Sequence, residues 1–237
     1  MAIGADIFEL SDRIGYRFND IGLLECAVTH ASYTNEQRVK GIKAVSNERL
    51  EFLGDAVLQI VVSEYLYSNY KKFREGALTK MRQRLVCEKT LAAAAERIEL
   101  GRFLNVGNGE ERGDCRSRPK VLADAFEALI GAVYLDCTEA GRDDYRELTL
   151  GLLEAELADS VTRSTDYKTM LQQLIEQDGS AVLEYRVAAE SGPEHEKTFT
   201  VEAYINNNKV GEGTAPTKKE AEMQAARIAL GLFGVAQ

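Results

Sequence analysis

Hydrophobic residues recur at helical spacing through most of the first two thirds of the chain. Three long runs keep this pattern, and each predicts a helix: residues 50–70, 78–98 and 121–136. Pro119 stands just before the third run, where the first turn of a helix tolerates proline. The Gly- and charge-rich stretch 101–119 predicts a loop. This part of the chain is therefore expected to be all-α.

The pattern changes in the last third of the chain. Residues 167–177 place apolar side chains on one helical face. Alternating apolar and polar positions at 183–189 and 199–205 then predict two strands. Residues 206–213 can supply a turn and a short third strand, and residues 217–233 return to helical spacing. The predicted order is α-β-β-β-α.

Between these two patterns lies a short segment without hydrophobic periodicity, residues 158–166, in which small and polar side chains dominate. A chain of 237 residues is long enough for two domains. We therefore expect one domain over residues 1–158, a linker over 159–165 and a second domain over 166–235.

Composition limits the function classes. The N-terminus lacks a secretory signal pattern, and no apolar run approaches the length of a membrane span, so we expect a cytoplasmic protein without a membrane partner. The four cysteines never form a C-x-x-C pair, which argues against structural zinc and for reduced thiols. The net charge of −9 is divided between the domains, so binding to nucleic acid has to rest on local motifs.

Acidic residues inside the most apolar runs are the most informative feature. Glu51 and Asp55 share one face of the first run, and Asp124 and Glu127 share a face of the third. Carboxylates gathered in a low-dielectric environment are costly unless something compensates their charge. If the two faces pack together, their oxygens would suit Mg²⁺, which can promote displacement at a phosphodiester. The alternative is that these acids cap helices or pair with nearby arginines, namely Arg49, Arg82 or Arg84.

Three segments resemble the ribonuclease III family. NERLEFLGDAVL (47–58) is similar to its signature and LADAFEALIGAVYLD (122–136) to its second acidic motif, while GYRFND with LLECAVTHASY (15–33) resembles its N-terminal lead-in. The resemblance covers essentially the whole chain. It implies an all-α endonuclease domain that forms a homodimer, followed by an α+β double-stranded RNA-binding domain.

The same resemblance implies the site residues and the reaction. The catalytic and metal-binding positions are Glu51, Asp55, Asp124 and Glu127, with Mg²⁺ as the cofactor and Mn²⁺ as a substitute. Glu48 and Glu75 match supporting acidic positions, and His30 is expected to be a structural, hydrogen-bonded histidine. The implied reaction is hydrolysis of double-stranded RNA to 5′-phosphate and 3′-hydroxyl ends with two-nucleotide 3′ overhangs. Ribosomal RNA precursors and other structured transcripts are the expected substrates.

In the second domain, DYKTMLQQL, GPEHEKTF and TKKEAEMQAA resemble the landmarks of a double-stranded RNA-binding domain. Lys218 and Lys219 would contact phosphates at the start of the last helix, although two adjacent lysines alone would merely indicate a solvated helix. The other expected RNA contacts are Thr169, Gln172, Gln173 and His195. The chain departs from the family pattern at Gln173, Ala215 and Pro216, which concerns affinity or loop shape more than identity.

Two other functions compete with this interpretation. A catalytically silent RNA-binding protein of the same architecture is disfavoured because both acidic motifs are complete. A metal-dependent hydrolase of small phosphorylated substrates would leave the C-terminal module without a purpose. Neither alternative calls for a small-molecule cofactor, and we expect none.

Overall fold

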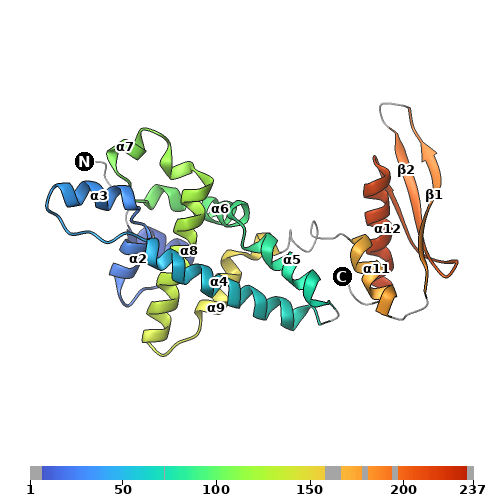
Figure 1. Cartoon of the computed structure of the whole chain (residues 1–237), viewed down its shortest axis with the longest axis horizontal. Coiled ribbons are helices and arrows are strands. Elements are labelled where there is room, and N and C mark those ends of the chain that lie inside the picture. The colour runs from blue at the N-terminus through green and yellow to red at the C-terminus, as the bar shows by residue number, and fades with distance from the viewer. Residues whose placement is uncertain (1–6, 72, 158–166, 178–180, 194–196, 234–237) are drawn as a thin grey trace. The chain divides into compact units, whose positions relative to one another are not determined.

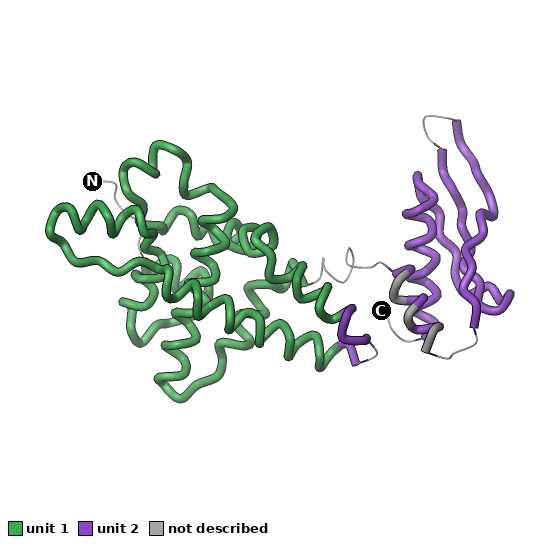
Figure 2. Tube along the Cα trace, viewed as in Figure 1, with its two compact units in different colours: residues 1–69, 78–158 green, residues 70–77, 159–237 purple. Residues whose placement is uncertain are grey.

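The computed structural model describes residues 7–71, 73–157, 167–177, 181–193 and 197–233. The chain divides into two compact units, one made of residues 1–69 and 78–158 and the other of residues 70–77 and 159–237 (Figure 2). The predicted linker, residues 159–165, lies outside the described residues, so the proposed domain boundaries stay predictions.

From residue 7 to residue 152 the described secondary structure is helical, apart from an isolated bridge between Thr29 and Asn105 (Figure 1). The helices are α1 (Ile7–Ile14), α2 (Ile21–Ala27), α3 (Ala31–Val39), α4 (Glu48–Asn69), α5 (Glu75–Leu85), α6 (Glu88–Arg97), α7 (Asn108–Glu111), α8 (Pro119–Glu139) and α9 (Tyr145–Leu152). Two short 3₁₀ helices, η1 (Leu100–Phe103) and η2 (Cys115–Ser117), flank α7. The prediction of an all-α first domain is confirmed.

Helix α8 forms the centre of this unit, because α2, α4 and α6 all pack against it. Phe126, Leu129 and Ile130 are fully buried, which explains why its sequence is apolar on nearly every side. Pro119 occupies the first turn of α8, as predicted. No helix within the described residues is long and apolar enough to cross a membrane.

The prediction of one continuous helix over 78–98 is wrong. The chain breaks at Cys87, whose extended backbone (φ −82°, ψ 155°) caps α6 and separates it from α5. Neither glycine nor proline marks this break, so local sequence gave no signal for it. Packing of α6 on α8, which buries Leu91 and Ala95, favours the change in direction over helix continuity.

The predicted loop 101–119 also needs correction, because it contains most of η1 and all of α7 and η2. Arg116 holds these short helices together. Its guanidinium donates to the carbonyl oxygens of Gly101 and Leu104 and to the carboxylate of Glu111. A single buried-facing cation thus organises a segment whose composition is typical of a loop.

The second unit has the predicted α-β-β-β-α order: α11 (Tyr167–Gln177), β1 (Leu183–Ser191), β2 (Thr198–Ile205), β3 (Asn208–Ala215) and α12 (Lys218–Leu232). The strands form an antiparallel sheet in the order β1-β2-β3, and α12 packs on β2 and β3 (Figure 1). Leu171 and Ile175 of α11 meet Ala229 and Leu230 of α12 in the core.

The strand register contains one irregularity that bears on function. Val187 pairs with Val201, but Ala189 pairs with Thr200, so Ala188 forms a bulge in β1. A bulge reverses the alternation of side chains along a strand. The predicted inward face therefore holds as far as Val187, whereas Ala189 lies on the opposite face.

Candidate metal centre

Helices α4 and α8 cross at glycines. A Cβ atom on Gly54 would lie 1.7 Å from the backbone oxygen of Glu127, and one on Gly131 would lie 2.4 Å from the backbone oxygen of Leu50. Both distances are far below van der Waals contact, so only glycine permits this approach. The crossing brings the start of α4 against the middle of α8, which positions the predicted acidic residues.

Three of these residues converge. One carboxylate oxygen from each of Glu51, Asp124 and Glu127 lies within 4.8 Å of the other two, and all three side chains are partly buried. We call these three residues the acidic cluster. Asp55, one turn after Glu51 on α4, is exposed at its rim and accepts a hydrogen bond from Gln59 Nε2 at 3.4 Å.

The electrostatics show that the cluster lacks sufficient positive charge of its own. Burial, followed by the charges of Asp55, Glu51 and Asp124, raises the pKa of Glu127 to about 7. Burial and then Asp124 also raise the pKa of Glu51. Like charges held together in a partly desolvated site resist ionisation in this way. A divalent cation would relieve the repulsion, and carboxylate oxygens are the donors that Mg²⁺ prefers.

Lys120 is a cation at this site that the sequence analysis missed. Its Nζ atom lies 3.3 Å from Asp124 Oδ2, one turn later on α8, and its charge lowers the pKa of both Glu51 and Glu127. The four-residue spacing between Lys120 and Asp124 was a signal that could have identified it. The lysine side chain is 74% exposed, so this ion pair is weak and readily exchanged.

The alternative pairing with arginines is not what the structure has. Arg82 donates to Ser63 Oγ at 3.0 Å. Within the part of the chain that the structure describes, no salt bridge joins Arg49, Arg82 or Arg84 to the acidic cluster or to Asp55. The cluster therefore keeps carboxylate oxygens available for a metal ion.

The two supporting acids lie outside the cluster. Glu48 begins α4, is exposed, and accepts a hydrogen bond from Ser46 Oγ at 2.7 Å, while its charge contributes to the raised pKa of Glu51. Glu75 is exposed at the start of α5. Their supporting roles stay predictions.

His30 has the structural role that was expected. It is the N-cap of α3, where its Nδ1 atom accepts a hydrogen bond from the backbone N–H of Ser32 at 3.2 Å. The same nitrogen lies 2.8 Å from Ser32 Oγ. A ring nitrogen engaged in capping is not presented as a metal ligand.

The predicted RNA-binding residues fall into three groups. Lys218 and Lys219 are exposed in the first turn of α12, which Thr217 caps through its side chain. Gln172 is exposed on α11. Thr169 and Gln173 also lie on α11, but their side chains, like the whole of His195, are outside the described residues.

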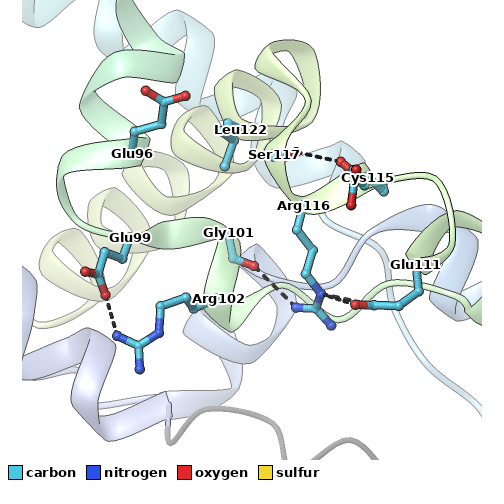
Figure 3. A pocket seen from close by; sticks show the side chains of 10 residues that line it. Glu96, Glu99, Gly101, Arg102, Glu111, Cys115, Arg116, Ser117 and Leu122 are labelled. Atoms are coloured by element: carbon cyan, nitrogen blue, oxygen red, sulfur yellow. Dashed lines mark hydrogen bonds and ion pairs between the residues drawn. The ribbon is translucent and has the colours of Figure 1, made fainter.

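A cavity of about 400 Å³ lies elsewhere in the first unit, among η1, η2 and the start of α8, and contains none of the cluster residues (Figure 3). Much of its polar lining is already paired: Arg116 binds Glu111, and Arg102 binds Glu99. These contacts stabilise the 101–119 segment, so we assign the cavity no part in the chemistry.

Two family models match the chain. The model described as "Ribonuclease-III-like" matches residues 20–148, and the model described as "Double-stranded RNA binding motif" matches residues 167–231. The chain belongs to the ribonuclease III family. It is a ribonuclease III-type endonuclease that carries a C-terminal double-stranded RNA-binding domain, as the sequence resemblance implied.

Full-length relatives support this membership. Ribonuclease 3 of Pelotomaculum thermopropionicum is 47% identical over 223 residues, which cover 93% of this chain and 90% of the relative. Ribonuclease 3 of Oceanobacillus iheyensis is 44% identical over 226 residues, with 95% and 97% covered. The nuclease domain of ribonuclease III from Campylobacter jejuni is 39% identical, with a TM-score of 0.56 over 63% of this chain and 97% of that domain.

Proposed function

We propose that this ribonuclease III-type endonuclease hydrolyses phosphodiester bonds of double-stranded RNA with Mg²⁺ held by Glu51, Asp55, Asp124 and Glu127. The observation that carries the proposal is the convergence of three carboxylates within 4.8 Å at a glycine-lined helix crossing. Mn²⁺, with similar oxygen-ligand chemistry, is expected to substitute.

The cation would supply activation of water and neutralisation of charge on the phosphate. The residues of the chain would hold it and orient the substrate. Glu51, Asp124 and Glu127 provide oxygens from two helices fixed by their crossing, and Asp55 adds a carboxylate at the rim. Lys120, released from Asp124 when the metal ion takes its place, could pair with an RNA phosphate. The products expected are 5′-phosphate and 3′-hydroxyl ends.

We further propose that the enzyme acts as a homodimer. Phe52, Ala56 and Ile60 follow one another at four-residue intervals on α4, and all three are exposed, Phe52 at 81% and Ile60 at 51%. An apolar stripe of this kind marks an interaction site, and its position beside Glu51 and Asp55 places the interface next to the metal centre. The related C. jejuni nuclease domain is described as having a region involved in dimer formation. Two centres in one dimer would cut both strands and leave two-nucleotide 3′ overhangs.

Binding of the duplex is assigned to the second domain, through Lys218 and Lys219 to phosphates and through Thr169, Gln172, Gln173 and His195 to the minor groove. We propose precursors of ribosomal RNA and other structured transcripts as natural substrates. A cytoplasmic location fits these substrates and stays a prediction.

The test is cleavage of a defined RNA hairpin by the full chain with Mg²⁺, with Mn²⁺ and with a chelator. We expect cleavage with either metal and none with the chelator, with 5′-phosphate ends and a two-nucleotide 3′ overhang on the products. Glu127→Gln should reduce the rate by at least about 100-fold, because it removes a ligand. Glu139→Gln, the matched change at an exposed residue on the same helix, should cleave normally. Metal-independent cleavage, or full activity of Glu127→Gln, would overturn the proposal.

A further inference from the structure

One carboxylate in the second unit is shared by two lysines. Glu190 Oε2 lies 2.8 Å from Lys197 Nζ, and Glu190 Oε1 lies 2.9 Å from Lys218 Nζ. The lysines come from different elements, because Lys197 immediately precedes β2 and Lys218 begins α12. The two hydrogen-bonded lysines lower the pKa of Glu190, so the carboxylate is charged at neutral pH.

The bulge in β1 places Glu190 there. Before the bulge, Glu184 and Arg186 occupy the sheet face opposite to that of Leu183 and Tyr185, which pack in the core. Regular alternation would put Glu190 on the same outer face as Glu184. Because Ala188 is an extra residue, Glu190 pairs instead with Phe199, whose side chain packs with Ala221 of α12. The bulge thus moves one negative charge to the side of the sheet where Lys218 lies.

Phe199 forms the base of the arrangement. The Nζ atom of Lys218 lies 5.1 Å from the centre of its ring, and that of Lys197 lies 5.5 Å away. Both ammonium groups are therefore held over one aromatic face as well as by one carboxylate. The ring fixes the two cations as a pair that remains in place when the carboxylate is exchanged for another anion.

The pair has the charge and spacing to receive an RNA phosphate. A carboxylate and a phosphodiester each present two oxygens that share one negative charge, and lysine binds either as a point charge. The side chains are 37% exposed for Glu190, 45% for Lys197 and 54% for Lys218, so an anion from solvent can reach them.

We propose that Glu190 occupies, in the RNA-free protein, the place of a backbone phosphate of the duplex. RNA binding then exchanges an internal carboxylate for a phosphate at Lys197 and Lys218. Glu190 is thereby an affinity-setting residue: it keeps the lysines paired in the free protein and competes with RNA. The inference rests on the proposed binding of double-stranded RNA by this domain.

A purely structural role for Glu190 predicts the opposite result. If Glu190 only positioned the two lysines for RNA, its loss would let them disperse and would weaken binding. If it competes with phosphate, its loss removes the competitor while Phe199 still holds the lysines. Exposed ion pairs of this kind contribute little, so the expected gain in affinity is about two- to fivefold.

The experiment is fluorescence anisotropy of a labelled RNA duplex with the full chain in a chelator, over a series of salt concentrations. Glu190→Gln is expected to bind more tightly than the unmodified chain. Its plot of log K against log salt should be steeper by up to about 0.9, since a lysine freed from Glu190 counts fully toward counterion release. The effect should disappear in a Lys218→Gln background.

Glu184→Gln is the matched control. It removes the same charge from the same strand, but on the outer face, where Glu184 pairs with Arg186 at 2.7 Å. It should change affinity less than Glu190→Gln, and thermal unfolding should show both variants folded. Equal or weaker binding by Glu190→Gln, or an equal gain in Glu184→Gln, would sink the inference. Absence of binding by the unmodified chain would instead count against the proposed function.

Discussion

At the scale of single residues, the sequence revealed the acidic residues but not their counter-ions. Glu51, Asp124 and Glu127 could be identified because charges inside apolar runs need a physical reason. Lys120 was missed because it precedes the apolar run and resembles any solvated lysine at the start of a helix. Glu190 and Lys197 could not be paired from sequence, since their approach depends on a bulge that shifts the alternation by one residue.

Glu127→Gln should stabilise the metal-free protein at alkaline pH. The pKa of Glu127 is about 7 in the folded chain against an ordinary value of 4.5, so between these pH values the folded state retains a proton that the unfolded chain has lost. Stability contributed by this residue therefore falls as pH rises through that window. Urea unfolding in a chelator at pH 8 should show the variant more stable by about 1–2 kcal/mol, a figure reduced for solvent screening of the cluster.

The difference should shrink toward pH 5, where Glu127 is protonated in the folded state. Mg²⁺ should reverse the order at pH 8, because it stabilises the unmodified chain by binding to the folded state. A variant less stable than the unmodified chain at pH 8 without metal would show that the carboxylates are already compensated.

At the scale of elements, amphipathic pattern was sufficient for the long helices and the strands, and insufficient where tertiary packing decides. The first and third runs became α4 and α8 nearly at their predicted bounds. The second run split at Cys87, where packing of α6 against α8 determines the direction of the chain. The 101–119 segment became short helices because Arg116 satisfies their carbonyl oxygens, a contact that composition does not reveal.

Gly54→Ala tests whether the helix crossing builds the site. The new Cβ would lie 1.7 Å from the backbone of Glu127, so α4 and α8 must separate. We expect a loss of about 2–3 kcal/mol of stability, comparable to overpacking a core, and a much larger proportional loss of cleavage. Gly151→Ala on α9, where an added Cβ meets nothing within 4 Å, is the control and should be neutral or stabilising. An active, stable Gly54→Ala enzyme would show that the close crossing is unnecessary.

At the scale of the whole molecule, the family architecture could be predicted from sequence, whereas the association state could not be derived from periodicity alone. The exposed stripe formed by Phe52, Ala56 and Ile60 is a feature of the folded surface, because the opposite side of α4 is equally apolar and buried. The net charge of −9 requires that RNA be bound by local groups of lysines, such as the pair at Glu190.

Ile60→Glu should disrupt the dimer. A charge in the centre of the apolar stripe would be buried without a partner at the proposed interface. Sedimentation at micromolar concentration should report about 52 kDa for the unmodified chain, twice its mass of 26.2 kDa, and a monomer for the variant. Val182→Glu, the same change at an exposed residue of the second unit, should remain dimeric. A monomeric unmodified chain would contradict the proposed assembly.

The most direct test of the account is the position of a metal ion in crystals of the chain grown with Mn²⁺. Anomalous scattering should give a peak about 2–2.3 Å from carboxylate oxygens of Glu51, Asp124 and Glu127, with Lys120 displaced from Asp124. A peak elsewhere, or Lys120 still bound to Asp124 with no ion among the three carboxylates, would contradict it.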